Sequence, residues 1–158
     1  MNNLPLHVLL VDDDDEDREL IRWALTSAIE QITINEMTSG QDLINWLTQQ
    51  RSMPRSEVKN ESEPITIILL DMHMPKLTGL ETLAYLGDMS MLPYIPVVML
   101  SSSISDQLKQ RAYQQGIHLF MLKPAGANGF YRVVEAVKLC YRDAVRIREW
   151  DRLNLDFH

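Results

Sequence analysis

Five short aliphatic segments, separated by stretches with helical spacing, most restrict how this chain can fold. The segments cover residues 7–11, 32–37, 65–70, 97–100 and 117–122. Those at 7–11, 65–70 and 97–100 are almost uninterrupted apolar runs, which is typical of parallel strands covered on both faces. The segment at 32–37 alternates polar and apolar residues, and this pattern predicts an edge strand with one face nearer to solvent.

Apolar residues recur at intervals of three or four between the predicted strands, as in helices that bury one face. Such helices are expected near residues 20–28, 43–47, 80–86 and 106–115, and from Gly126 toward Trp150. In the first of these helices, Trp23 lies on the predicted buried stripe. A strict alternation of strands and helices requires right-handed crossovers, so the sequence predicts an α/β fold: a doubly wound parallel sheet with helices on both faces.

The composition excludes several classes of protein. The chain has 158 residues, one cysteine and a formal net charge of −7 at pH 7. This length suits a single domain, and one cysteine cannot form an internal disulfide, so we expect a cytoplasmic protein. Membrane insertion is not expected, because no apolar run approaches the roughly 18 residues that a spanning helix needs. The acidic balance disfavours binding to nucleic acid, which requires a cationic surface.

Reactive side chains follow four of the predicted strands at the point where each strand ends. Asp12 and Asp13 follow the first strand, Asp71 the third, Ser101 the fourth and Lys123 the fifth. The carboxyl ends of parallel strands meet at one edge of the sheet, where ligands bind. Two carboxylates about 4 Å apart repel by roughly 4 kcal/mol, so such a cluster needs a proton or a cation. Mg²⁺ is the expected cation, because it prefers oxygen ligands.

This pattern resembles the receiver domains of two-component response regulators. The similar features are the pair Asp12-Asp13, the run Asp71-Met-His-Met-Pro75 with Gly79 eight residues after Asp71, Ser101, and Lys123-Pro124. They span roughly residues 6–145. The resemblance implies a flavodoxin-like fold, with a five-stranded parallel sheet in the order 2-1-3-4-5.

The resemblance also assigns roles at the site. Asp71 would accept a phosphoryl group from a sensor histidine kinase or a histidine phosphotransfer protein. Asp13 would bind Mg²⁺ or Mn²⁺ directly and Asp12 largely through water, with Asp71 and the backbone carbonyl of His73 as further ligands. Lys123 would form an ion pair at the site. The protein would not be an enzyme with a separate substrate, because it would catalyse only its own phosphotransfer and slow autodephosphorylation.

The same resemblance implies a conformational switch. Ser101 would donate its hydroxyl to the phosphoryl group, and Phe120, at the aromatic switch position, would turn inward. The peptide bond before Pro124 is expected to be cis, an isomer that only X-Pro bonds adopt cheaply. The change would reach an unknown downstream protein.

Several interpretations stay open at this stage. Asp14 to Asp17 are expected to cap the first helix, although some of these carboxylates could instead tune the metal site. The His73 side chain is a candidate to affect the water that hydrolyses an acyl phosphate. A phosphohydrolase of the haloacid dehalogenase type would carry a second Asp where His73 stands. A degenerate receiver that acts only as a binding module would usually have lost one of the site residues.

The division of the chain leaves a short segment outside the receiver. Residues 1–145 are expected to form the receiver, with an extended loop at 50–64, and residues 146–158 a helical extension or tail. The loop resembles that of single-domain regulators that partner bacterial phytochromes. About a dozen residues after the receiver are too few for a DNA-binding domain, so the regulator is expected to stand alone. Trp150, Leu153, Leu155 and Phe157 in the tail would either fold back or form a homodimer seam with the last helix.

Overall fold

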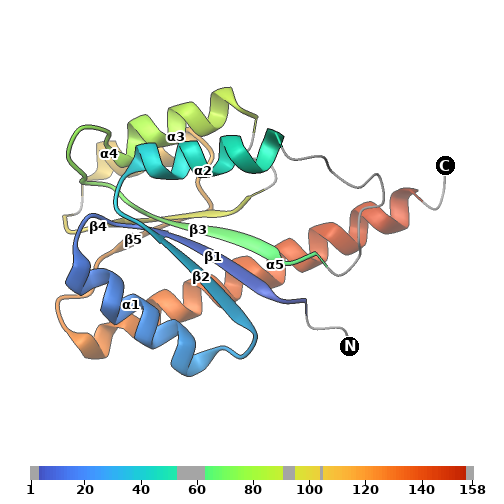
Figure 1. Cartoon of the computed structure of the whole chain (residues 1–158), viewed down its shortest axis with the longest axis horizontal. Helices are drawn as coiled ribbons and strands as arrows, with labels where there is room; N and C mark the ends of the chain where they lie inside the picture. The colour runs from blue at the N-terminus through green and yellow to red at the C-terminus, as the bar shows by residue number, and fades with distance from the viewer. Residues whose placement is uncertain (1–3, 53–62, 91–94, 104, 156–158) are drawn as a thin grey trace.

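Five parallel strands form one sheet in the centre of the molecule (Figure 1). The structure is a computed structural model that describes residues 4–52, 63–90, 95–103 and 105–155. The strands are β1 (Leu6–Val11), β2 (Ile32–Met37), β3 (Ile65–Asp71), β4 (Val97–Ser101) and β5 (Leu119–Leu122). They pair in the order β2-β1-β3-β4-β5, as the sequence predicts, and the polar strand β2 lies at an edge.

Helices cover both faces of the sheet (Figure 1). They are α1 (Asp15–Ala28), α2 (Gly40–Ser52), α3 (Gly79–Asp88), α4 (Asp106–Gln114) and α5 (Tyr131–Leu155), with a short 3-10 helix, η1 (Ala127–Phe130), before α5. Helices α1 and α5 pack on one face, and α2, α3 and α4 lie on the other. The doubly wound α/β fold is therefore confirmed.

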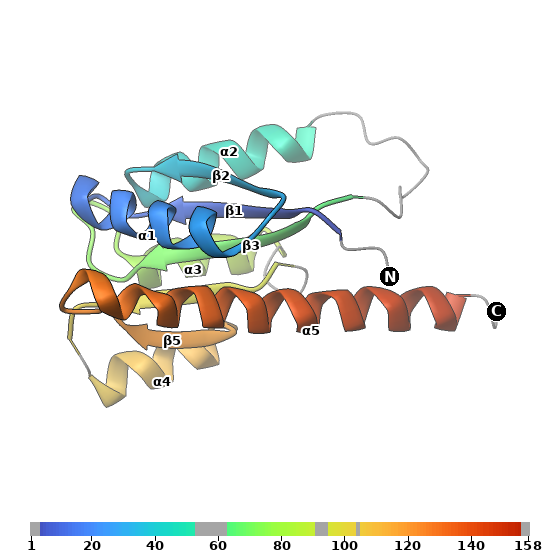
Figure 2. The same cartoon turned by 90° about the horizontal axis from the view of Figure 1, so that it is seen from below.

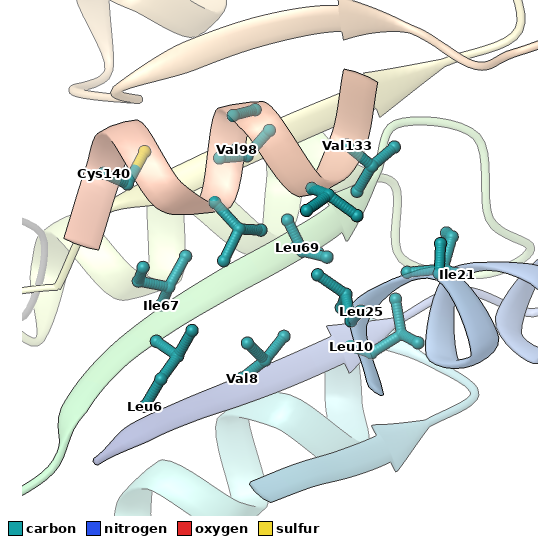
Figure 3. Packing of buried hydrophobic residues seen from close by; sticks show 14 of the residues in the cluster. Leu6, Val8, Leu10, Ile21, Leu25, Ile67, Leu69, Val98, Val133 and Cys140 are labelled. Atoms are coloured by element: carbon teal, nitrogen blue, oxygen red, sulfur yellow. The ribbon is translucent and has the colours of Figure 1, made fainter. Parts of the chain in front are cut away.

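Each central strand contributes to two separate cores. In β1, Val8 and Leu10 join the core under α1 and α5, whereas Leu9 and Val11 join the core under α2 and α3 (Figure 3). Successive side chains of a strand point to opposite faces, and here both faces are buried. This arrangement explains why the sequences of the central strands are almost continuously apolar.

The buried face of α1 differs from the predicted one. The helix buries Ile21, Ala24 and Leu25, whereas the indole of Trp23 is 64% exposed. Helical spacing fits both stripes, and the larger aliphatic pair Ile21 and Leu25 packs against the sheet. Arg22, next to Trp23, pairs with Glu36 of β2 at the outer side of the helix.

Helix α5 continues without a break through residue 145 and extends past the sheet (Figure 2). Its inner side is held by Tyr141, whose hydroxyl donates to the Leu4 carbonyl at 2.6 Å. Ile147, Trp150 and Leu153 remain exposed, so these apolar side chains do not fold back onto the domain. The predicted loop at 50–64 starts too early, because α2 continues to Ser52. Residues 53–62, Phe157 and the side chain of Leu155 lie outside what the structure describes. In the described part, no helix has the length and apolar character needed to cross a membrane.

Candidate functional site

Three carboxylates from two neighbouring strands meet at the carboxyl edge of the sheet. Asp12 and Asp13 directly follow β1, and Asp71 is the last residue of the adjacent strand β3. One oxygen from each lies within 4.8 Å of the other two. Asp12 and Asp71 are buried, whereas Asp13 is exposed. Such a set of hard oxygen donors fits a divalent cation.

Asp12 is fixed by contacts to both of its carboxylate oxygens. Its Oδ1 accepts a hydrogen bond from the Asp14 N–H at 2.9 Å, and its carbonyl accepts one from Arg18 at 2.6 Å. Its Oδ2 is buried and forms an ion pair with Lys123 Nζ at 2.7 Å. The charge of this buried carboxylate is therefore compensated by Lys123.

The ammonium of Lys123 lies among the carboxylates. Its Nζ is 2.7 Å from Asp12, 3.0 Å from Asp17 and 3.4 Å from Asp71. Burial lowers the pKa of Lys123, but the hydrogen bonds and charges of these carboxylates outweigh it and raise the pKa above its ordinary value. Lys123 is therefore a fixed positive charge at the site.

The surroundings of Asp71 disfavour its ionised form. Burial and the nearby charge of Asp12 raise the pKa of Asp71 to about 7, although Lys123 and the His73 N–H act in the opposite direction. One ammonium thus does not fully offset the cost of two buried carboxylates. The residues at this site therefore fit a divalent cation.

Asp17 lies at the site. The sequence favours a helix cap for Asp14 to Asp17 and leaves open a role of some of these carboxylates at the metal site. Asp14 is the N-cap, and its side chain accepts a hydrogen bond from the Asp17 N–H at 2.9 Å. The Asp17 carboxylate itself reaches Lys123. The spacing in sequence does not show this contact, because it joins α1 to Lys123, which is 106 residues away in the chain.

Ser101 is completely buried at the end of β4. Its hydroxyl donates to the Ser103 carbonyl at 2.7 Å and accepts from the Ser103 N–H at 3.3 Å. His73 Nε2 lies 3.4 Å from the same oxygen. Phe120 is half-buried in β5, and its N–H donates to the Tyr113 hydroxyl of α4 at 3.1 Å.

The expected cis peptide before Pro124 is wrong. The Lys123–Pro124 bond is trans, as is every other peptide bond in the described residues. The two X-Pro isomers differ by only about 0.5–1 kcal/mol, so the local sequence does not decide between them. Packing around this bond includes Gly129, where an added Cβ would lie 2.6 Å from Pro124 Cβ.

Gly79 brings the start of α3 close to the site. Its N–H donates to the Met72 carbonyl at 2.9 Å. A Cβ at this position would lie 2.7 Å from the Asp71 carbonyl oxygen and 2.8 Å from Met72 Cα. A glycine eight residues after Asp71 therefore lets the start of α3 lie in close contact with the backbone at the end of β3.

The fold and the site together define a doubly wound α/β protein that combines carboxylates, an ammonium and a hydroxyl at the carboxyl edge of its sheet. The chain matches the family model of the response regulator receiver domain over residues 8–135. It belongs to this family, as the resemblance in sequence implied.

Known relatives agree with this assignment. The chain is 30% identical over 138 residues to the probable methanogenesis regulatory protein FilR2 of Methanothrix harundinacea, which covers 85% of this chain and 82% of that protein. It is 25% identical over 146 residues to the response regulator Rcp1 of Synechocystis, with 92% and 95% covered. Both relatives therefore match along most of their own length.

Two solved structures are similar over most of their length. The phosphorylated cyanobacterial phytochrome response regulator RcpA has a TM-score of 0.69 and 28% identity, and covers 85% of this chain and 91% of its own. The Mn²⁺-bound form of Rcp1 has a TM-score of 0.68 and 25% identity, with 85% and 92% covered. Receiver domains bind Mg²⁺ or Mn²⁺, and this chain presents the corresponding acidic cluster.

Proposed function

We propose that this protein is a cytoplasmic response regulator that is switched on when Asp71 accepts a phosphoryl group. The observation that carries this proposal is the position of Asp71, which is buried beside Asp12, Asp13 and Lys123 at the end of β3. A carboxylate with a raised pKa next to a fixed ammonium is suited to bind an electrophilic phosphoryl group. The phosphoryl donor would be a phosphohistidine on a sensor kinase or a phosphotransfer protein.

The phosphoryl transfer needs only the phosphohistidine and the Asp71 carboxylate as reactants. An Asp71 carboxylate oxygen forms a bond to phosphorus, and the bond between phosphorus and the donor imidazole nitrogen breaks. The electron pair of the broken bond stays with the donor nitrogen, and the imidazole leaves as a neutral ring because its other nitrogen already carries a proton. Lys123 neutralises charge on the phosphoryl oxygens, as ammonium groups do at phosphoryl transfer sites.

Four groups would hold Mg²⁺ or Mn²⁺. Asp13 would coordinate directly, Asp12 largely through water, and Asp71 and the His73 carbonyl would complete the protein ligands. The bound cation supplies positive charge near the phosphoryl oxygens. The exposed position of Asp13 and the cluster that its carboxylate forms with those of Asp12 and Asp71 support this assignment.

Phosphorylation would be read out through Ser101 and Phe120. The Ser101 hydroxyl would leave the Ser103 carbonyl and donate to a phosphoryl oxygen, and Phe120 would turn inward. The surface formed by α4 and β5 would change shape, and an unknown partner protein would recognise it. The protein would catalyse only its own phosphotransfer and a slow loss of its phosphate.

Intact mass after incubation with acetyl phosphate tests this function. The natural protein should gain about 80 Da, the mass of one phosphoryl group, when Mg²⁺ is present. Asp71→Asn, or removal of Mg²⁺, should abolish the gain. No gain under any condition would favour the alternative of a degenerate receiver that binds partners without phosphorylation.

The exposed stripe on α5 supports a second copy of the chain as a further partner. Ile147, Trp150 and Leu153 of α5 are exposed, and the C-terminal end of this helix extends past the sheet (Figure 2). Packing these apolar side chains against a second copy would remove them from water, which is favourable.

A further inference from the structure

The Ser101 hydroxyl is held away from the carboxylates by two neighbours. It donates to the Ser103 carbonyl at 2.7 Å and accepts from the Ser103 N–H at 3.3 Å. The third contact joins Ser101 Oγ to His73 Nε2 at 3.4 Å. His73 comes from the loop after β3, so this contact links the two loops that flank the site.

The direction of the His73 contact follows from the number of available hydrogens. A serine hydroxyl has one hydrogen, and the Ser103 carbonyl takes it because a carbonyl only accepts. Ser101 Oγ can therefore only accept from His73. Nε2 must carry a hydrogen, which selects the Nε2–H form of the ring or the protonated ring.

The backbone around His73 fixes the direction of its ring. Met72 and Met74 on either side are buried in the core under α2 and α3, so the His73 side chain between them points outward. The His73 N–H also donates to Asp71 Oδ1 at 3.3 Å. The residue thus contacts the phosphoacceptor through its backbone and Ser101 through its ring.

We propose that His73 is a positioning residue that holds Ser101 in its unphosphorylated place and so opposes activation. This proposal rests on the proposed function, because it concerns the hydroxyl that would move to the phosphoryl group. To move, Ser101 must give up the Nε2–H bond as well as its contacts with Ser103. Without the imidazole donor, movement of the Ser101 hydroxyl to the phosphoryl group costs less free energy.

Three substitutions of His73 separate the donor from the rest of the side chain. In His73→Gln, the amide nitrogen reaches the place of Nε2 and can still donate to Ser101. In His73→Asn, the amide nitrogen takes the place of Nδ1 and stops short of Ser101. In His73→Leu there is no donor. His73 is exposed, so all three variants should fold.

Beryllofluoride, a stable mimic of a phosphoryl group on a carboxylate, measures the cost of the move. In the presence of Mg²⁺, its affinity should rise about three- to tenfold in His73→Leu and His73→Asn, as expected when one hydrogen bond no longer opposes binding. His73→Gln should bind like the natural protein. The proposal would be overturned if all three variants bound beryllofluoride with equal affinity, or if His73→Leu bound it more weakly than the natural protein does.

A second background shows whether the effect passes through Ser101. When Ser101→Ala is combined with His73→Leu, the affinity should equal that of Ser101→Ala alone, because the contact is already lost. An undiminished effect of His73→Leu in this background would assign the effect to something other than Ser101.

Nitrogen NMR of the His73 ring gives a direct readout of the contact. Without beryllofluoride, Nε2 should carry a hydrogen, and its shift should change when Mg²⁺ and beryllofluoride bind. A neutral ring with hydrogen on Nδ1 alone contradicts the proposal. If the natural protein binds no beryllofluoride, the proposed function fails and this inference fails with it; if it binds and the variants do not differ, only the inference fails.

Discussion

At the scale of single residues, the charge of Lys123 is divided among three carboxylates. Asp12 and Asp17 lie closer to its Nζ than Asp71 does, at 2.7 and 3.0 Å against 3.4 Å. Asp71 therefore remains only partly compensated, and burial raises its pKa to about 7. The proposed phosphoacceptor is thus a carboxyl group whose ionised form this site disfavours.

Asp71→Asn should stabilise the metal-free protein at high pH. The pKa of Asp71 is about 7 in the folded chain, against 3.8 as its ordinary value, so the folded state keeps a proton that the unfolded state has lost. The Asp71 contribution to stability therefore falls as pH rises from about 4 to 7. At pH 8 the free energy of unfolding of Asp71→Asn should exceed that of the natural protein by about 2 kcal/mol. Below pH 4 the two free energies should converge.

Urea unfolding in the presence of EDTA, from pH 4 to pH 8, measures this difference. Added Mg²⁺ should stabilise the natural protein more than the variant, because binding to the folded state adds to stability. If the free energies of unfolding of the two proteins change with pH in parallel, the ionised form of Asp71 does not destabilise the folded state.

Asp17→Asn should release Lys123 toward Asp71. With one competing carboxylate removed, phosphorylation by acetyl phosphate should become about two- to fivefold faster, because charge-assisted hydrogen bonds of this kind are worth about a kcal/mol. Glu16→Gln removes the same charge from an exposed neighbour and should leave the rate unchanged. Equal rates for both variants would mean that Asp17 does not compete for Lys123.

At the scale of elements, the junction between β3 and α3 determines the position of Asp71. The capping box of α3 fixes its start, because the Thr78 side chain accepts from the Glu81 N–H and the Glu81 side chain accepts from the Thr78 N–H. Gly79 then allows the helix to begin against the backbone of Asp71 and Met72. Helix α3 thereby buttresses the loop that carries His73.

Gly79→Ala should destabilise the protein by about 1–3 kcal/mol, the usual cost of overpacking. The new Cβ would meet backbone atoms at 2.7 and 2.8 Å, which cannot move independently of the site. Gly126→Ala is a matched control, because nothing lies within 4 Å of its added Cβ. Thermal or urea unfolding compares the two variants, and equal stability would show that the β3–α3 junction relaxes freely.

At the scale of the whole molecule, α5 has two different sides. Its inner side supplies Val133, Val137 and Cys140 to the core (Figure 3), whereas its far end carries apolar side chains into solvent. The far end is also tied to the start of β3, because Arg148 donates to the Glu63 carbonyl at 2.6 Å. The extension is thus anchored to the domain and exposes apolar side chains that self-association would bury.

Trp150→Glu should convert a dimer of this protein to a monomer. The indole of Trp150 is 64% exposed on the proposed interface, and burying a charge there is unfavourable. Trp23→Glu is the matched control, because Trp23 is equally exposed but lies on α1. Light scattering over a range of concentrations gives the mass, and a monomeric natural protein would exclude this interface.

The sequence by itself determined the order of strands and helices, the edge position of β2, and the convergence of Asp12, Asp13, Asp71, Ser101 and Lys123 on one edge. Local periodicity and the geometry of parallel sheets are sufficient for these features. Only the tertiary structure decided that Trp23 faces solvent, that Asp17 reaches Lys123, that the bond before Pro124 is trans, and that the end of α5 does not fold back. These features depend on small energy differences between alternatives that the local sequence permits equally, and contacts between distant segments decide among them.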